Sequence, residues 1–172
     1  MRTRCRCRSG LIDEPLEMTT QRIAAITLDE RSVVRRSPEI ESERNAAIAD
    51  LLHENSFAPA SGQAGPFALH LAIEENRLLI DINGADQSSE TIQLGLDAFR
   101  RIVKDYFVVC ESYYDAVRRQ NLSQVEAIDA GRRALHNEGS ALLTERLADK
   151  VALDHATSRR LFTLICVLHL RA

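Results

Sequence analysis

The sequence has no tryptophan, and aromatic residues make up only 5% of its 172 positions. It also lacks an excess of basic residues, because its formal net charge is −3. Proteins that hold nucleic acids usually combine a basic surface with aromatic side chains on which bases stack. Both shortages argue against nucleic acid as a partner.

Long apolar segments are missing too. The longest, LFTLICVLHL at Leu161–Leu170, has ten residues, whereas a membrane-spanning helix needs roughly 20. The basic start MRTRCRCR leads into SGLIDEPLE without the apolar segment of a signal peptide. We therefore expect a cytoplasmic protein with no membrane partner. The β-branched residues in FTLICV leave helix and strand both open for the ten-residue segment.

Cysteine is scarce, with four residues in the chain. Cys110 and Cys166 lie in apolar surroundings, where a reduced cysteine packs as a small hydrophobic residue. Cys5 and Cys7 offer two ligands, and a structural zinc needs four. The chain also contains no glycine-rich phosphate loop, serine-nucleophile elbow or paired-histidine metal motif. We expect no metal and no cofactor.

Patterned sequence begins just after Met18, and residues 1–17 show neither a helical nor a strand period. We predict that residues 1–20 are a disordered or non-native extension, with Met18 as a candidate initiator. Residues 21–172 are expected to form a single domain, since a chain of this length can bury one sizeable core.

Alternating apolar residues predict strands in the middle of the chain. PFALHLAIEENRLLIDING, residues 66–84, contains two such runs joined at Glu75-Asn76, which is typical of a hairpin. The register that gathers its apolar residues on one face pairs Ile73 with Leu78, Leu71 with Ile80 and Leu69 with Ile82. Residues 22–29 and 90–97 are further strand candidates. One apolar face indicates an antiparallel sheet covered on one side.

Apolar residues at three- and four-residue spacing predict helices over residues 38–55, 97–120 and 123–148, and in a last segment after Asp154. Ser37 and Asp154 are candidate N-caps, and Ser123-x-x-Glu126 has the pattern of a capping box. Residues 55–66 are rich in Pro, Gly and Ser, so we expect a loop there. The predicted fold class is α+β: a small antiparallel sheet of three to four strands packed on one face by about four helices.

The segment GRRALHNEGS, residues 131–140, concentrates polar residues on one predicted helix. At roughly 100° per residue, Arg132 and His136 share one stripe, and Arg133 and Asn137 share the next. These four are our candidate binding residues. The alternative interpretation is a packed helix whose flank carries an Asp129–Arg133 ion pair.

Two other features of this segment concern the choice between a binding site and a packed helix. Glu138 lies nearly opposite His136 on the helix, so the two side chains cannot share one metal ion. Gly131 and Gly139 predict close approach by another element, because a glycine inside a helix costs about 0.8–1 kcal/mol relative to alanine.

A second basic group, Arg100, Arg101 and Lys104, is the next candidate contact surface, since such side chains can grip an anion. The three residues lie opposite Phe99 and Ile102 on the predicted helix. An ordinary charged flank is therefore the alternative interpretation.

The hairpin register also places His70 opposite Asp81 on the outward face, with Gln93 expected next in the row. A histidine beside a carboxylate is a general acid–base pairing. Ser56 and Ser61 are the serines from which a nucleophile could come. A solvated cross-strand pair, worth roughly 0.2–1 kcal/mol, is the other interpretation.

Several long strings, in order along the chain, resemble one protein family: LDERSVVRRSPEIESER, LLHENSFAP, FRRIVKDYFVVCESYYDAVR, QVEAIDAGRRALHNEGSALLTERL and RRLFTLICVLHLR. From about Met18 to Ala172, the chain is similar to the small alphaproteobacterial proteins of uncharacterised protein family two-six-two. The resemblance implies a bacterial cytoplasmic protein. It implies no activity, cofactor or catalytic residue.

We expect a non-catalytic binding or interaction module for an unknown protein partner or an anionic ligand, because the polar residues cluster without a nucleophile–base set. The alternative is a small enzyme acting on a phosphorylated or anionic metabolite, with His136 or His70 as the acid–base group. A concave pocket joining Arg132 and His136 to the loop at residues 55–66 would favour the enzyme. A flat or convex surface there would favour the binding module.

Overall fold

The computed structural model describes residues 20–29, 31 and 37–169. Its main elements follow in this order: β1 (Ile23–Leu28), α1 (Pro38–His53), β2 (Phe57–Pro59), β3 (Phe67–Glu74), β4 (Arg77–Asn83), β5 (Ser89–Gly95), the 3-10 turn η3 (Asp97–Phe99), α2 (Arg100–Arg118), α3 (Leu122–Leu147), β6 (Val151–Leu153) and α4 (His155–His169). The predicted α+β class is confirmed. The predictions for the N-terminal extension, Thr20 apart, and for Cys5 and Cys7 lie outside the described residues.

The hairpin of β3 and β4 has the predicted register. Its pairs include Leu69 with Ile82, and Leu71 with Ile80. Glu75 and Asn76 have φ angles of 46° and 63°, the left-handed conformation that a two-residue hairpin turn requires. β5 pairs antiparallel with β4, as the alternation in residues 90–97 predicts.

The sheet order is β1-β3-β4-β5, and β1 runs parallel to β3. The prediction of a wholly antiparallel sheet is therefore wrong for this pair, and the sheet is mixed. The cause is the connection: residues 29–66 contain α1, and a parallel neighbour needs a long crossover of that kind, usually through a helix.

A second, two-stranded sheet joins β2 to β6 in antiparallel register. The loop predicted for residues 55–66 is therefore wrong for residues 57–59. Each strand has only three residues, too few to show an alternating pattern in the sequence. Phe57 is fully buried, with its ring 5.7 Å from that of Phe67, so burial holds β2 in place.

Two of the three predicted N-caps are confirmed. Ser37 Oγ accepts from Ile40 N at 3.2 Å, and Asp154 Oδ1 accepts from Thr157 N at 2.7 Å. The capping box at Ser123 is wrong, because α3 starts two residues earlier with Asn121 as its cap.

The apolar segment at residues 161–170 is helical as far as it is described, through His169 of α4. Every described residue of this segment is buried. Packing on all sides therefore outweighs the strand preference of its β-branched residues.

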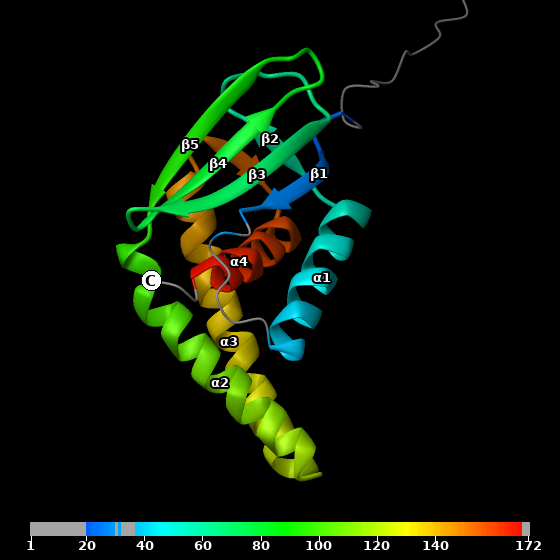
Figure 1. The fold of residues 1–172 in the computed structure, drawn as a ribbon, viewed down its shortest axis with the longest axis vertical. Helices are drawn as coiled ribbons and strands as arrows, with labels where there is room; N and C mark the ends of the chain where they lie inside the picture. Colours follow the sequence, from blue (N-terminus) through cyan, green and yellow to red (C-terminus); the bar gives the residue numbers. More distant parts are fainter. Residues whose placement is uncertain (1–19, 30, 32–36, 170–172) are drawn as a thin grey trace, which may run out of the picture.

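The layers are plain in Figure 1, where the four-stranded sheet lies above the helices. Leu69, Leu71, Ile80 and Leu94 point toward the helices and are at most 6% exposed, so the predicted apolar floor is confirmed. α4 packs against α1, α3 and β3 in the middle of the helical layer. α2 and α3 form a long antiparallel pair that extends away from the sheet (Figure 1).

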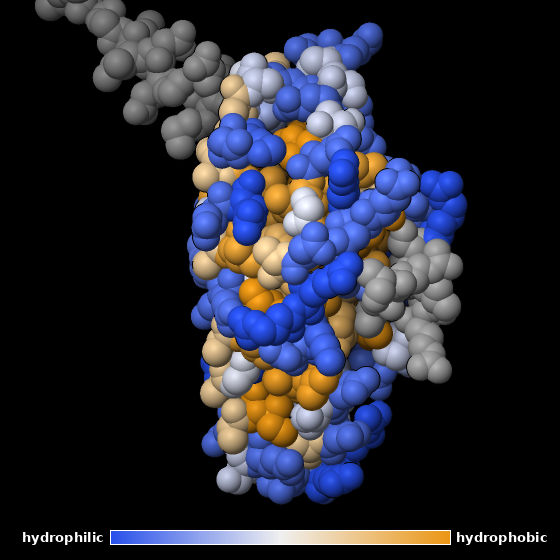
Figure 2. Space-filling model, turned by 90° about the vertical axis from the view of Figure 1, so that its left-hand side faces the viewer, coloured by the Kyte–Doolittle hydropathy of each residue, from blue (hydrophilic) through white to orange (hydrophobic). Residues whose placement is uncertain are grey.

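One side of the molecule has a hydrophilic surface with scattered apolar patches (Figure 2). Figure 2 shows the side of the molecule that carries β5 and α2, where orange apolar groups are broken up by blue hydrophilic ones. Val108, Val117 and Leu122, all on α2 or α3, are large apolar residues exposed to solvent.

No helix in the described ranges is long and apolar enough to cross a membrane.

Candidate functional site

Side chains from all four α-helices meet at a recess of about 160 Å³. α3 contributes three of the predicted residues, Arg132, Arg133 and His136. The other helices contribute Glu43 from α1, Tyr106 from α2, and Arg159 and Thr163 from α4. We call this the arginine recess. Its residues span most of the chain, so only the packing of the helices creates it.

Arg132 is fixed on three sides. Its Nη1 lies 3.2 Å from Glu43 Oε1, its Nε lies 3.3 Å from Asp129 Oδ1, and its guanidinium carbon is 5.0 Å from the centre of the Tyr113 ring. Tyr114 donates its hydroxyl to the same Glu43 oxygen at 2.9 Å. Cation–π and ionic contacts together give this guanidinium a defined position.

The other two arginines differ in how their charge is compensated. Arg133 lies 3.1 Å from Asp129. Arg159 donates to the neutral side-chain oxygen of Asn137 and has no carboxylate partner among the described residues. Three guanidinium groups thus face two carboxylates, those of Glu43 and Asp129. One positive charge remains, which is the condition for attracting an anion.

His136 is held by one hydrogen bond and two rings. Its Nε2 lies 2.6 Å from Thr163 Oγ1. The imidazole stacks on Tyr106 at 5.6 Å between ring centres, with an interplanar angle of 26°, and meets Phe162 edge-on at 5.6 Å. These contacts fix the plane of the imidazole at the wall of the recess.

The same surroundings keep this imidazole uncharged. Burial, followed by the positive charges of Arg159 and Arg132 and by His155, lowers the pKa of His136 from 6.5 to about 4. Thr163 Oγ1 also lies 3.2 Å from the Arg159 carbonyl oxygen. When the hydroxyl donates its one proton to that carbonyl, His136 must donate from Nε2, and its Nδ1 keeps a free lone pair.

The structure brings together three of the four first-rank candidates. Asn137 does not line the recess, but it binds Arg159, which does. The Asp129–Arg133 ion pair of the alternative interpretation is present as well. A packed helix flank and a recess therefore coexist on α3.

Sequence reasoning missed four lining residues, namely Glu43, Tyr106, Arg159 and Thr163. One signal was available, since Arg159 and Thr163 are four residues apart and so share a helix face. No pattern in the sequence indicates that this face of α4 packs against α3.

The loop at residues 55–66 stays apart from the recess, because none of its residues lines it. Ser61 Oγ donates to Glu90 at 2.9 Å, and Ser56 N donates to Thr157 Oγ1 at 3.0 Å. The concave surface at Arg132 and His136 is thus present without the loop that we associated with an enzyme.

The second candidate group lies elsewhere, at the start of α2, and none of its members lines the arginine recess. Arg101 Nη2 is 2.6 Å from Glu138 Oε1, and Arg100 Nε is 3.6 Å from Asp97. Lys104 and Arg100 line a separate hollow of about 490 Å³. Ion pairing takes up much of the charge of this group.

His70 and Asp81 face each other across β3 and β4, as predicted. Thr27 Oγ1 lies 2.9 Å from His70 Nδ1, and Thr91 donates to Asp81 at 2.6 Å. The expectation that Gln93 is next in the row is wrong, because Thr91 occupies that place. Along β4, Asp81 alternates with the buried Ile80 and Ile82, so the row lies on the face of the sheet that points away from the apolar core.

No three His, Cys, Asp or Glu side chains of the described chain come together in a way that could hold a metal ion.

Comparison with known proteins gives a family. Residues 20–171 match the family described as "Uncharacterised protein family (UPF0262)".

Relatives confirm this match. UPF0262 protein Rru_A2770 of Rhodospirillum rubrum is 57% identical over 153 residues, which cover 88% of this chain and 94% of the relative. UPF0262 protein BRADO6636 of Bradyrhizobium sp. is 55% identical over 157 residues, covering 90% and 94%. UPF0262 protein amb3341 of Paramagnetospirillum magneticum is 52% identical over 152 residues, covering 88% and 97%. No solved structure matches the chain. The chain belongs to the uncharacterised protein family UPF0262.

Proposed function

We propose that this protein is a non-catalytic binding protein that holds a small anionic group, a carboxylate or a phosphate, in the arginine recess. The observation that carries the proposal is the guanidinium of Arg159. It lines the recess, and its side-chain partner among the described residues is the uncharged amide of Asn137. An anion at this place gains a charge-assisted hydrogen bond without having to displace a carboxylate.

The size of the recess agrees with such a ligand group. At about 160 Å³ it is smaller than the roughly 300–1,000 Å³ typical of sites that enclose whole small molecules. It therefore suits one anionic group better than an entire nucleotide. The uncharged His136 at its wall adds no negative charge that would repel an anion.

Isothermal titration calorimetry with sodium phosphate and with acetate tests the proposal. We expect binding to the full chain at low ionic strength, weakening as salt is added. Arg159→Gln should lower the affinity at least tenfold. Arg160→Gln is the matched control, because Arg160 is its neighbour on α4 but does not line the recess. If neither anion binds, or if the two variants behave alike, the proposal is wrong.

The contact between His136 and Thr163 favours a second candidate, an enzyme acting on an anionic metabolite. A neutral imidazole 2.6 Å from a hydroxyl resembles a base beside a nucleophile. Against it, Thr163 is only 6% exposed, and its hydroxyl also lies within reach of the Arg159 carbonyl. Turnover of p-nitrophenyl phosphate or p-nitrophenyl acetate that Thr163→Val abolishes would establish this candidate in place of the first.

A further inference from the structure

A larger cleft of about 450 Å³ opens between α1, α2 and α4. Its volume lies in the range of sites that enclose a small organic molecule. Much of its wall is apolar or weakly polar, and the residues that provide this wall are Ile40, Phe107, Cys110, Tyr114, Cys166 and Val167. We call it the apolar cleft.

The apolar cleft and the arginine recess adjoin each other. Glu43, Tyr106 and Thr163 line both hollows. One molecule can therefore extend from one into the other, with Tyr106 at the boundary. An apolar hollow beside a cationic one is a combination that suits a molecule with two unlike ends.

Charge is distributed unevenly along this path. Glu111 and Glu39 lie at the cleft, and Arg118 pairs with Glu39 at 3.5 Å. The exposed Glu111 has no ion-pair partner among the described residues. A second anionic group would be repelled there, whereas the recess attracts one. The two hollows thus favour one orientation: anion toward Arg159, uncharged body toward Phe107.

The two thiols of the cleft support an uncharged body. Burial raises the pKa of Cys110, and it raises the pKa of the fully buried Cys166 well above its ordinary value. Both thiols are therefore protonated at neutral pH and behave as small apolar groups.

From this juxtaposition, and resting on the proposed function of the recess, we infer that the ligand is an amphipathic molecule with a single anionic group. Its carboxylate or phosphate lies in the arginine recess, and its aliphatic or aromatic body fills the apolar cleft. The anchoring charge gives specificity for the head group, and the cleft gives affinity that grows with the apolar surface buried.

Calorimetry with a series of alkanoates, acetate to decanoate and each below its micelle concentration, tests the inference. We expect the affinity to rise roughly fourfold with each added methylene until the cleft is full, and then to level off. Octanol, which lacks the charge, should bind at least tenfold more weakly than octanoate. Octyl phosphate measured beside octanoate decides which head group the recess prefers.

Two variants locate the apolar body. Ile40→Trp narrows the cleft from a half-buried position on α1, and it should make the affinity level off at a shorter chain. Val117→Trp is the matched control, because Val117 is exposed on α2 and lines none of the hollows described here. Should Ile40→Trp fail to fold, the comparison of octanol with octanoate on the unaltered chain still tests whether the anionic group anchors the ligand.

The outcomes separate this inference from the proposed function. If phosphate and acetate bind but affinity does not grow with chain length, the recess stands and the inference is wrong. If octanol binds as well as octanoate, or Arg159→Gln leaves octanoate affinity unchanged, the apolar body is not anchored by the recess and the inference is again wrong. If no member of any series binds, both fail.

Discussion

Gly139 of α3 faces the ring of Phe162 in α4 so closely that a Cβ at position 139 would lie 2.1 Å from the ring's Cζ atom. Gly131, two turns earlier on the same helix, has nothing within 4 Å of the equivalent point. The sequence predicts close approach at both glycines. The prediction is confirmed at Gly139, where α4 packs against the C-terminal part of α3. It is wrong at Gly131, which lies nearer the N-terminal end of α3 and has open space beside it.

The pair of glycines gives the first prediction. Gly139→Ala should lower the free energy of unfolding by about 1–3 kcal/mol, since the fully buried Phe162 ring has to move. Gly131→Ala should raise it by about 0.5–1 kcal/mol, because alanine is the better helix former where space is free. Urea unfolding followed by circular dichroism measures both. Changes of the same sign would contradict the packing of α3 on α4.

Acid should destabilise the protein through His136. The unfolded imidazole takes up a proton near pH 6.5, whereas the folded one resists protonation until about pH 4. Between these values the unfolded state binds more protons, so stability falls as the pH drops from 6.5 toward 4. His136→Gln should reduce this loss by roughly 2–3 kcal/mol.

The measurement for His136 is the free energy of unfolding at pH 7.5 and at pH 4.5. Burial also lowers the pKa of His169, so part of the acid effect should survive in the variant. His53→Gln, an exposed substitution at the end of α1, is the control and should keep the full pH dependence. An unchanged pH dependence in His136→Gln would refute the assignment.

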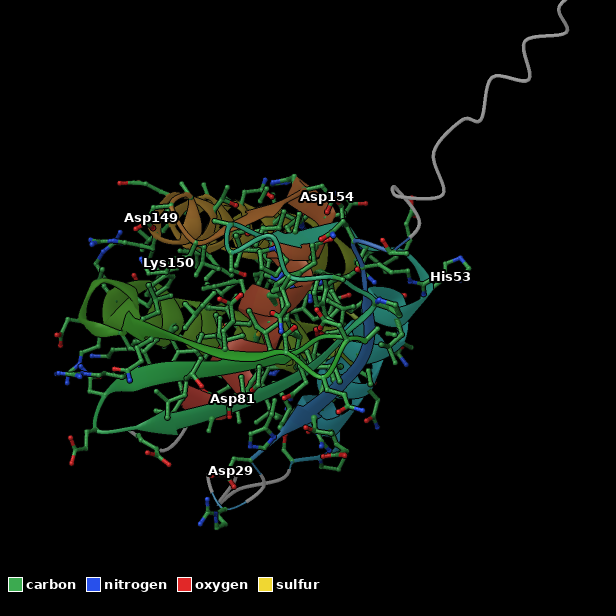
Figure 3. The ribbon with its side chains drawn as sticks, turned by 90° about the horizontal axis from the view of Figure 1, so that it is seen from above. Asp29, His53, Asp81, Asp149, Lys150 and Asp154 are labelled. Carbon is green, nitrogen blue, oxygen red and sulfur yellow. The ribbon has the colours of Figure 1, made fainter. Side chains whose placement is uncertain are left out.

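The cap of α4 gives a third prediction. Asp154→Ala removes the acceptor for Thr157 N at the start of a buried helix and should cost about 1 kcal/mol. Asp149→Ala is the control, because the ion-pair partner of Asp149 in the described part of the chain is its neighbour Lys150 at the surface (Figure 3). Thermal unfolding should show a lower midpoint for the first variant and an unchanged one for the second. Equal midpoints would mean that the cap contributes nothing.

Asn55 connects the end of α1 to the first strand. Its Oδ1 accepts from Ile23 N at 2.6 Å, and its Nδ2 donates to the carbonyls of Ile23 and Leu51 at 2.9 and 2.7 Å. Asn55→Ala should cost about 1–3 kcal/mol, because it leaves these backbone groups without their partner. Asn55→Asp should also destabilise, since its carboxylate would face two carbonyl oxygens.

Urea unfolding of both Asn55 variants checks this prediction, with Asn83→Ala as the control. Asn83 is exposed at the end of β4, so its loss should leave the urea midpoint unchanged. A midpoint for Asn55→Ala equal to that of Asn83→Ala would show that the link between α1 and β1 carries no stability.

The hairpin could be predicted from the sequence because Leu69, Leu71 and Ile80 alternate and a tight turn leaves one register that buries them together. β2 could not, since three residues carry no period and the partner strand β6 begins only at Val151. The start of α3 shows another limit. Asn121 and Ser123 are both good caps, and local sequence does not choose between them.

The sequence also predicts one part of the candidate site and not the other. Helical spacing alone puts Arg132 and His136 on one stripe, and the structure keeps them together at the recess. The uncompensated charge of Arg159 depends on how α4 crosses α3, and the shared wall at Tyr106 depends on α2. Such relationships between helices are set by packing of the whole core, which no local pattern encodes.

From Leu122 to Glu138, α3 has no fully buried residue, and burial begins at Gly139. A stretch of helix that buries so little can open while the rest of the fold stays closed. Its amide protons should therefore exchange with solvent faster than those of residues 139–147. Glu43 and Thr163 already hold Arg132 and His136, which lie in this part of α3. An anion that bridges these side chains to Arg159 would add a further contact to the rest of the protein and slow that exchange.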